Sequence, residues 1–131
     1  MSELNPALIP LSLYIHMPWC VRKCPYCDFN SHAVPDGQLS TDLEQQYLAA
    51  LVADFETQLE MAQGRSIHSV FIGGGTPSLI SAQGYTWLFE QLRARLDFEP
   101  DCEITLEANP GTVEHDPFAD YLAAGINRLS I

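Results

Sequence analysis

The sequence predicts an α/β fold built on a parallel β-sheet. Short apolar segments alternate along the chain with longer segments whose apolar residues recur at helical spacing. No internal repeat and no low-complexity stretch interrupts this alternation. Because strands that alternate with helices are joined by right-handed crossovers, neighbouring strands run parallel. We therefore expect the element order βαβαβαβ.

Four short segments are expected to form the strands. They are residues 11–16 (LSLYIH), 67–72, 103–108 (EITLEA) and 126–131. Prolines bound the first segment on both sides, and the second runs directly into Gly73–Pro77. A parallel strand needs neighbours on both sides and helices over its faces, so a final strand with nothing after it leaves an open edge and an uncovered face. We therefore expect part of a larger α/β protein, an incomplete barrel.

The first two helices are expected between the first three strands. The first opens at Thr41, with Glu44 as the partner that completes a capping box, and closes at Gly64. Ser81 is expected to cap the second helix. The expected apolar face of this second helix comprises Trp87, Leu88, Leu92 and Leu96.

The third helix is expected to begin at Asp116 and Pro117, which would act as its cap and its first-turn proline. Gly125 is expected to end it. In terms of domains, residues 1–10 are expected to form an N-terminal tail. Residues 11–131 are expected to form one incomplete core domain that stops after about four strands.

The charge balance narrows the classes of partner. The chain has 131 residues, with 17 acidic against 6 basic side chains and a net charge of −11. Nucleic acids and anionic membrane surfaces need clustered Lys and Arg, so we expect neither as a partner. No segment approaches the ~20 apolar residues of a transmembrane helix, and residues 1–10 lack the basic start and apolar run of a signal peptide. We therefore expect a cytoplasmic protein.

Three cysteines lie in a long loop that is expected at residues 17–39, with the spacing Cys20-x-x-x-Cys24-x-x-Cys27. Disulfides are rare in a reducing cytosol, so this crowding is more typical of metal ligands. Iron–sulfur cubanes ordinarily take four cysteines, and Phe29 stands at the local fourth position. The spacing therefore predicts a cluster with three thiolate ligands and one iron open to another group.

Two other interpretations of the cysteines stay open. Zinc could bind the three thiolates together with His16 or His32, although structural zinc sites usually place paired ligands at two separated points. Three unrelated buried thiols are disfavoured, because an exposed polar loop suits inert thiols poorly. Cys102 stands alone beside an expected strand, where we expect a core or surface residue rather than a fourth ligand.

Two further features lie at the ends of expected strands. The glycines of Gly73–Thr76 let backbone groups approach a ligand closely, although a tight turn without a ligand also explains them. The segment lacks a P-loop lysine, so nucleoside triphosphate binding is not expected. Glu107 ends the third strand, and a solvated carboxylate is its simplest alternative. Because active sites of parallel α/β proteins lie at the carboxyl ends of the strands, we expect the cysteine loop, the glycines and Glu107 on one rim.

Aromatic residues accompany these features. Tyr14 and His16 lie two positions apart in the first expected strand, so they point to the same side. A core position and a ligand-facing position for Tyr14 both stay open. Tyr26 lies between two of the cysteines, where it could cover a cluster or stack on an adenine.

The motifs together resemble one family. They are YIHMPWC at residues 14–20, CPYCDF at residues 24–29, GGGTPS at residues 73–78 and EANP at residues 107–110. Their order and spacing resemble the radical S-adenosylmethionine (SAM) family of oxygen-independent coproporphyrinogen III oxidases and their relatives, from about residue 11 to residue 131. The resemblance implies the N-terminal part of a partial (β/α) TIM-type barrel. The nearest branch looks like the heme chaperones, the HemW proteins.

The resemblance also implies site residues by position. Cys20, Cys24 and Cys27 match the ligands of a [4Fe–4S] cluster, with SAM on the open iron. The implied SAM contacts are Tyr14, Tyr26, Gly74, Gly75, Thr76 and Glu107. In the oxidases, one electron from the cluster cleaves SAM, and the 5′-deoxyadenosyl radical removes hydrogen from the propionate side chains of coproporphyrinogen III. No catalytic residue beyond this cluster and SAM site is implied.

The resemblance leaves more than one function open. The oxidases carry a further cysteine two residues after the third ligand, where this chain has Phe29, which favours a heme chaperone that delivers heme to a recipient hemoprotein. An oxidase acting on a porphyrinogen is the alternative, and a structural zinc or interaction module is another. The family continues with more barrel strands, a C-terminal domain and the chaperones' heme-binding motif. We therefore expect this piece to be inactive alone.

Overall fold

The structure, a computed structural model, describes residues 9–20, 32–33, 40–107 and 116–130. In this part of the chain the strands are β1 (Leu11–Met17), β2 (Trp19–Cys20), β3 (His32–Ala33), β4 (Ile67–Gly74), β5 (Phe98–Glu107) and β6 (Arg128–Ser130). The helices are α1 (Thr41–Thr57), α2 (Ala82–Arg95) and α3 (Phe118–Ala124), and the short 3₁₀ turns are η3 (Leu59–Ala62) and η4 (Pro77–Leu79).

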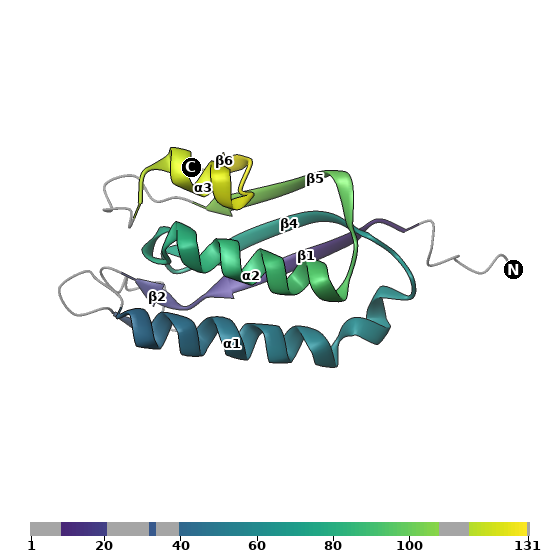
Figure 1. The fold of residues 1–131 in the computed structure, drawn as a ribbon, viewed down its shortest axis with the longest axis horizontal. Helices are drawn as coiled ribbons and strands as arrows, with labels where there is room; N and C mark the ends of the chain where they lie inside the picture. Colours follow the sequence, from purple (N-terminus) through teal and green to yellow (C-terminus); the bar gives the residue numbers. More distant parts are fainter. Residues whose placement is uncertain (1–8, 21–31, 34–39, 108–115, 131) are drawn as a thin grey trace, which may run out of the picture.

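Four strands form one parallel sheet in the order β1-β4-β5-β6 (Figure 1). Helix α1 lies between β1 and β4 in the sequence, α2 between β4 and β5, and α3 between β5 and β6. The predicted parallel α/β class is therefore confirmed. β2 and β3 pair in a separate two-stranded parallel sheet, within the segment that was expected to be a loop. Pairs of only two residues are too short to leave a periodic signal in the sequence.

All three helices cover the same face of the four-stranded sheet, and α2 packs between α1 and α3 (Figure 1). Alternate strand residues point into this helix layer and are buried. They are Ile15 and Met17 of β1, Val70 and Ile72 of β4, and Ile104 and Leu106 of β5. The other face, here called the open face, carries Tyr14, His16 and Phe71, and no helix of the described residues covers it. None of these helices is long and apolar enough to cross a membrane.

Helix α1 begins at Thr41, as predicted, but its cap differs. Ser40 is the N-cap, and its side-chain oxygen accepts a hydrogen bond from the Leu43 amide at 3.2 Å. Glu44 does not close the predicted capping box. Glu44 lies on the buried face of α1. Its carboxylate instead accepts hydrogen bonds from the amide and the hydroxyl of Ser81, the residue before α2.

Helix α2 is capped by Ser81 as predicted, through a hydrogen bond from the Gly84 amide to the Ser81 hydroxyl at 2.9 Å. Its predicted apolar face is correct for Leu88 and Leu92, which are buried, and Leu96 is half-buried. The prediction is wrong for Trp87, which is 40% exposed. The neighbouring helices contact a slightly rotated face of α2, so Tyr85 and Phe89 fill the core there.

The start of α3 also differs from the prediction. The helix begins at Phe118 with Pro117 in the cap position and no side-chain cap. Asp116 caps α2 rather than α3, because its carboxylate accepts a hydrogen bond from the Ala82 amide at 2.7 Å. Gly125 ends α3 with a φ of 116°, as expected of a glycine at this position.

The strands are longer or shorter than predicted at several ends. β5 starts at Phe98, earlier than predicted, because Phe98 pairs with Ile67 across an irregularity in the register. β4 extends into the first two glycines, and β6 covers only Arg128–Ser130. Residue 108, the predicted end of the third strand, lies outside the described residues.

Candidate functional site

The end of β4 passes very close to the end of β1. Gly74 has a φ of 109°, and a Cβ atom at this position would lie 2.6 Å from the Met17 carbonyl oxygen and 2.7 Å from the His16 ring. The Gly75 amide donates a hydrogen bond to that same Met17 oxygen at 2.6 Å. Only glycine combines this backbone conformation with this approach. The glycine run therefore joins the two strand ends.

Gly73 lies on the open face under two aromatic side chains. A Cβ atom there would lie 2.8 Å from a ring carbon of Phe71 and 3.2 Å from the Tyr14 hydroxyl oxygen. The two aromatic rings stack above this position, with centroids 6.1 Å apart and planes 12° apart. The missing side chain at Gly73 therefore makes room for these two rings, and the predicted role of the glycines in binding a ligand stays a prediction.

Tyr14 faces outward on the open face rather than into the core. Its side chain is 56% exposed, and its hydroxyl lies 3.3 Å from Nδ1 of His16, within hydrogen-bond distance. Partial burial, and then the negative charge of Glu107, raise the pKa of the Tyr14 phenol. Of the two positions that the sequence left open for Tyr14, the core position is wrong, and its predicted contact with a ligand stays a prediction.

Glu107 is the last residue of β5 and pairs in register with Ser130 of β6. It is half-buried, and its charge reaches the Tyr14 phenol across β4. Because Ile72 pairs with Leu106 and His16 pairs with Gly73, the ends of β1, β4 and β5 form one edge of the sheet. The expected common rim of the glycines and Glu107 is therefore present, and we call it the carboxyl edge.

The cysteine loop begins at this carboxyl edge. Cys20 lies on β2, three residues beyond the end of β1, and the turn η4 packs beside β2. Thr76, which precedes η4, is buried. Cys24, Cys27 and Tyr26 lie outside the described residues, so their predicted roles stay predictions.

No group of three or more His, Cys, Asp and Glu residues with metal-binding geometry occurs within the part of the chain that the structure describes. Cys102 is buried in the core as a free thiol, and burial raises its pKa. An inert core thiol of this kind agrees with the expectation that Cys102 is not a ligand.

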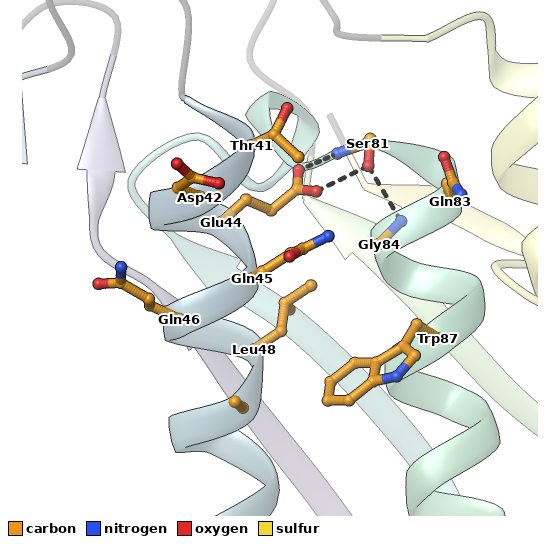
Figure 2. A pocket seen from close by; sticks show the side chains of 11 residues that line it. Thr41, Asp42, Glu44, Gln45, Gln46, Leu48, Ser81, Gln83, Gly84 and Trp87 are labelled. Atoms are coloured by element: carbon orange, nitrogen blue, oxygen red, sulfur yellow. Dashed lines mark hydrogen bonds between the residues drawn. The ribbon is translucent and has the colours of Figure 1, made fainter.

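Carboxylates hold the start of α2 behind the carboxyl edge. The Glu44 carboxylate accepts hydrogen bonds from the Ser81 amide at 2.6 Å and from the Ser81 hydroxyl at 2.9 Å (Figure 2). Figure 2 shows the groove between α1 and α2 in which these groups lie, with the Trp87 ring along its lower part. Both oxygens of Glu44 are used inside the protein, so this part of the groove has a structural role.

Sequence reasoning missed several residues near the site. Phe71 was hidden in an apolar run, although its spacing from Gly73 places both on one face of the strand. Tyr47 of α1 donates a hydrogen bond to the His16 carbonyl oxygen, and no local pattern in the sequence links these two residues. Contacts of this kind join elements that are far apart in the chain, so only the tertiary structure reveals them.

Comparison with known proteins places these features in a family. The family model described as the radical SAM superfamily matches residues 14–131. The chain belongs to the radical SAM superfamily. The radical SAM match covers every described residue of the site, including the glycines and Glu107. It also includes the residues of the cysteine motif that lie outside the described ranges.

Curated radical SAM relatives are similar over most of this chain. The heme chaperone HemW of Haemophilus influenzae is 54% identical over 130 residues, which cover 96% of this chain and 33% of the relative. The heme chaperone HemW of Escherichia coli is 56% identical over 124 residues, which cover 95% and 32%. The chain therefore spans about a third of the length of these relatives.

One solved radical SAM structure is similar in fold. The coproporphyrinogen III oxidase HemN of Escherichia coli has a TM-score of 0.78 and 32% sequence identity, over 95% of this chain and 28% of that protein. The predicted fold, the first part of a radical SAM barrel, is confirmed by this likeness together with the parallel strand order.

Radical SAM proteins as a family use a [4Fe–4S] cluster and SAM, and the residues of this site fit both groups. Gly73 and Gly74 let the ends of β1 and β4 meet closely at this edge, where a Cβ atom would overlap Met17, His16 or Phe71. Glu107 supplies a carboxylate at the same edge, and strand β2 brings the first cysteine of the motif beside η4. Thiolates are the ligands that iron–sulfur clusters use.

Proposed function

We propose that this chain forms the first part of the cofactor site of a radical SAM heme chaperone. One observation carries the proposal: β2 with Cys20, the glycines that end β4, and Glu107 at the end of β5 lie along the same carboxyl edge. Membership of the radical SAM superfamily supports the cluster and SAM. The identity of 54% and 56% to two HemW proteins supports the chaperone.

Each residue of the motif has a role in this proposal. Cys20, Cys24 and Cys27 hold three irons of a [4Fe–4S] cluster as thiolates, and the fourth iron takes the amine and carboxylate of SAM. The SAM-binding residues are Tyr14, Tyr26, Gly74, Gly75, Thr76 and Glu107. When bound, the cluster supplies the electron for reductive cleavage of the SAM sulfonium.

In this proposal the residues of the chain bind SAM and orient it. The backbone of Gly74 and Gly75 offers polar groups beside the end of β1, because glycine permits the two strand ends to approach closely. Glu107 accepts hydrogen bonds from the ammonium or hydroxyl groups of SAM. The exposed Tyr14 phenol, held beside His16, presents a donor on the open face.

The chaperone is favoured over the oxidase for two reasons. Phe29 stands where the oxidases have a further cysteine, and the identity to HemW exceeds the 32% identity to HemN. The fold likeness to HemN keeps oxygen-independent coproporphyrinogen III oxidation as the second candidate. The partners in the proposal are SAM, heme and a recipient hemoprotein, in the cytoplasm, where reducing conditions preserve thiolates.

Metal analysis after anaerobic purification tests the cofactor. We expect iron and sulfide in about equal amounts, and loss of both when Cys20, Cys24 or Cys27 is replaced by Ala. Cys102→Ala is the matched control and should keep the cluster. Zinc at about one ion per chain without sulfide would instead support the structural zinc module.

An assay of the natural protein that contains this chain distinguishes the chaperone from the oxidase. With SAM, a reductant and coproporphyrinogen III under anaerobic conditions, we expect no decarboxylation. We expect bound heme to pass from this protein to an apo-hemoprotein. The transfer is measured as the loss of heme absorbance from the donor protein. Clear SAM-dependent decarboxylation would refute the chaperone assignment.

A further inference from the structure

Each of the three helices carries one tyrosine whose hydroxyl reaches a backbone carbonyl near the carboxyl edge. The Tyr47 hydroxyl of α1 donates a hydrogen bond to the His16 oxygen at the end of β1. Tyr85 of α2 donates to the Pro77 oxygen at 2.6 Å. Tyr121 of α3 lies close enough to donate to the Ser78 oxygen at 2.8 Å and the Ile80 oxygen at 2.7 Å. We call Tyr47, Tyr85 and Tyr121 the edge tyrosines.

The turn η4 depends on these hydroxyls for much of its hydrogen bonding. Among the described residues it has two backbone hydrogen bonds of its own, from the Leu79 amide to the Thr76 oxygen at 3.0 Å and from the Ile80 amide to the Pro77 oxygen at 3.2 Å. Short 3₁₀ turns have poorer hydrogen-bond geometry than α-helices. Contacts from buried phenols to the oxygens of Pro77, Ser78 and Ile80 therefore help to define its conformation.

The positions of two edge tyrosines are set by the core. Tyr85 and Tyr121 are 0% and 1% exposed, and their rings meet edge to face at 5.9 Å between centroids. A fully buried aromatic ring in a close-packed core has little freedom to move. Each hydroxyl is therefore a fixed donor, and the carbonyl that accepts from it is fixed in turn.

The segments that these hydroxyls hold are the ones that form the site. η4 follows directly after Gly75 and Thr76, and it packs beside β2, which carries Cys20. Tyr47 holds the strand end that leads into β2, where the Gly75 amide also donates to the Met17 oxygen. The helix layer thus contacts both the glycine segment and the start of the cysteine loop.

We propose that Tyr47, Tyr85 and Tyr121 are positioning residues, which hold the glycine segment and the end of β1 in the geometry that binds SAM. This inference rests on the proposed function for the identity of the ligand. The simpler interpretation is that each buried phenol needs an acceptor for its hydroxyl and that these carbonyls are merely the nearest ones. If the tyrosines are positioning residues, removal of a hydroxyl changes the site alone. If the phenols only need an acceptor, removal of a hydroxyl changes the stability of the whole chain.

Hydrogen exchange followed by mass spectrometry makes this distinction. Tyr85→Phe and Tyr121→Phe keep the buried rings and remove only the hydroxyls. We expect amide exchange in residues 73–80 to become about 10-fold faster in each variant, at denaturant concentrations where the remaining sheet stays protected. If one of these two variants folds poorly, the other still provides the test.

Asn127→Ala is the matched control. The Asn127 side chain also makes two hydrogen bonds to backbone, donating to the Cys102 oxygen at 3.0 Å and accepting from the Ile104 amide at 2.8 Å, but it lies away from the carboxyl edge. We expect this variant to accelerate exchange around residues 102–104 and 127–128 and to leave residues 73–80 and Glu107 unchanged. Equal acceleration throughout the chain in all variants would overturn the positioning role.

SAM binding provides the second measurement. On the cluster-loaded protein, we expect Tyr85→Phe and Tyr121→Phe to weaken SAM binding by about 3- to 10-fold at unchanged iron content, and Asn127→Ala to leave it unchanged. Unchanged SAM binding in both tyrosine variants would overturn the inference. Failure of the wild-type protein to bind iron or SAM would count against the proposed function, while the exchange measurement would still decide whether the tyrosines hold the segment.

Discussion

Gly74 meets the end of β1 with no room for a side chain. Its φ of 109° is one that residues with a Cβ atom rarely adopt, and the Met17 carbonyl oxygen occupies the space that a Cβ atom would need. The backbone contact between the ends of β1 and β4 therefore depends on glycine at position 74. The same contact brings the next residue, Gly75, into hydrogen-bond distance of β1.

The replacement Gly74→Ala should destabilise the chain more than Gly64→Ala does. Both glycines have positive φ, so both variants incur the left-handed strain of roughly 1–2 kcal/mol. At Gly64 nothing lies within 4 Å of the added Cβ, whereas at Gly74 the overlap adds about 1–3 kcal/mol. Urea unfolding of both variants measures the difference in free energy. Equal losses of unfolding free energy in the two variants would show that β1 does not obstruct a side chain at position 74.

Tyr85 predicts a pH dependence of stability. Burial, and then the nearby Tyr121 and Glu44, raise the Tyr85 pKa well above 10, its ordinary value and that of the unfolded chain. The folded state then holds a proton that the unfolded state loses, so stability is complete below about pH 10 and falls as the pH rises further. Urea unfolding from about pH 8 to 11 should show a shallower loss for Tyr85→Phe than for the wild type. Parallel curves would contradict this.

Elements are tied together at the start of α2. A helix leaves its first amide groups without partners, and here α1 and the segment before α3 supply the acceptors. Glu44 accepts from Ser81, and Asp116 accepts from the Ala82 amide. Carboxylates at a helix N-terminus also interact favourably with its dipole. One end of α2 therefore fixes the relative positions of all three helices directly behind η4.

The variant Glu44→Gln tests this link between elements. An amide keeps one acceptor oxygen for the Ser81 amide, but its NH₂ group can only donate, so the Ser81 hydroxyl no longer donates to a charged carboxylate and the charge at the helix N-terminus is lost. We expect a loss of about 1–3 kcal/mol in the free energy of unfolding. Glu90→Gln on the exposed side of α2 is the matched control and should change stability by less than about 0.5 kcal/mol. Similar values for both would contradict the link.

The whole molecule combines a one-sided sheet with a large negative charge. The helices bury one face, while the open face carries Tyr14, His16 and Phe71 together with Gly73. Seventeen acidic side chains against 6 basic ones leave a net charge of −11. Self-repulsion of this kind destabilises a compact state.

Salt should therefore stabilise the chain. Raising NaCl from about 0.01 M to about 0.15 M shortens the screening length from about 30 Å to about 8 Å, which weakens repulsion between exposed carboxylates. The midpoint of thermal unfolding should rise over this range. Choline chloride at the same concentrations is the control for specific sodium binding and should give the same rise. A constant or falling midpoint would contradict the role of net charge.

The amino-acid sequence by itself determined the parallel α/β class, the helix start at Thr41, the helix cap at Ser81, and the place of the glycines and Glu107 at strand ends. These features are local: apolar periodicity, caps and glycine positions act within a few residues. The cysteine spacing is local in the same sense, and its predicted role as a cluster site follows from sequence and family alone.

The tertiary structure decided the features that depend on partners distant in sequence. Glu44 and Asp116 look like caps of their own helices but bond at the start of α2, because the first amides of a helix have no acceptor within the helix. Tyr14 is exposed because the described helices pack on the opposite face of the sheet, where Ile15 and Met17 are buried. The edge tyrosines meet their carbonyls across the helix–sheet interface. Such contacts form when elements pack, and no pattern within a single segment encodes them.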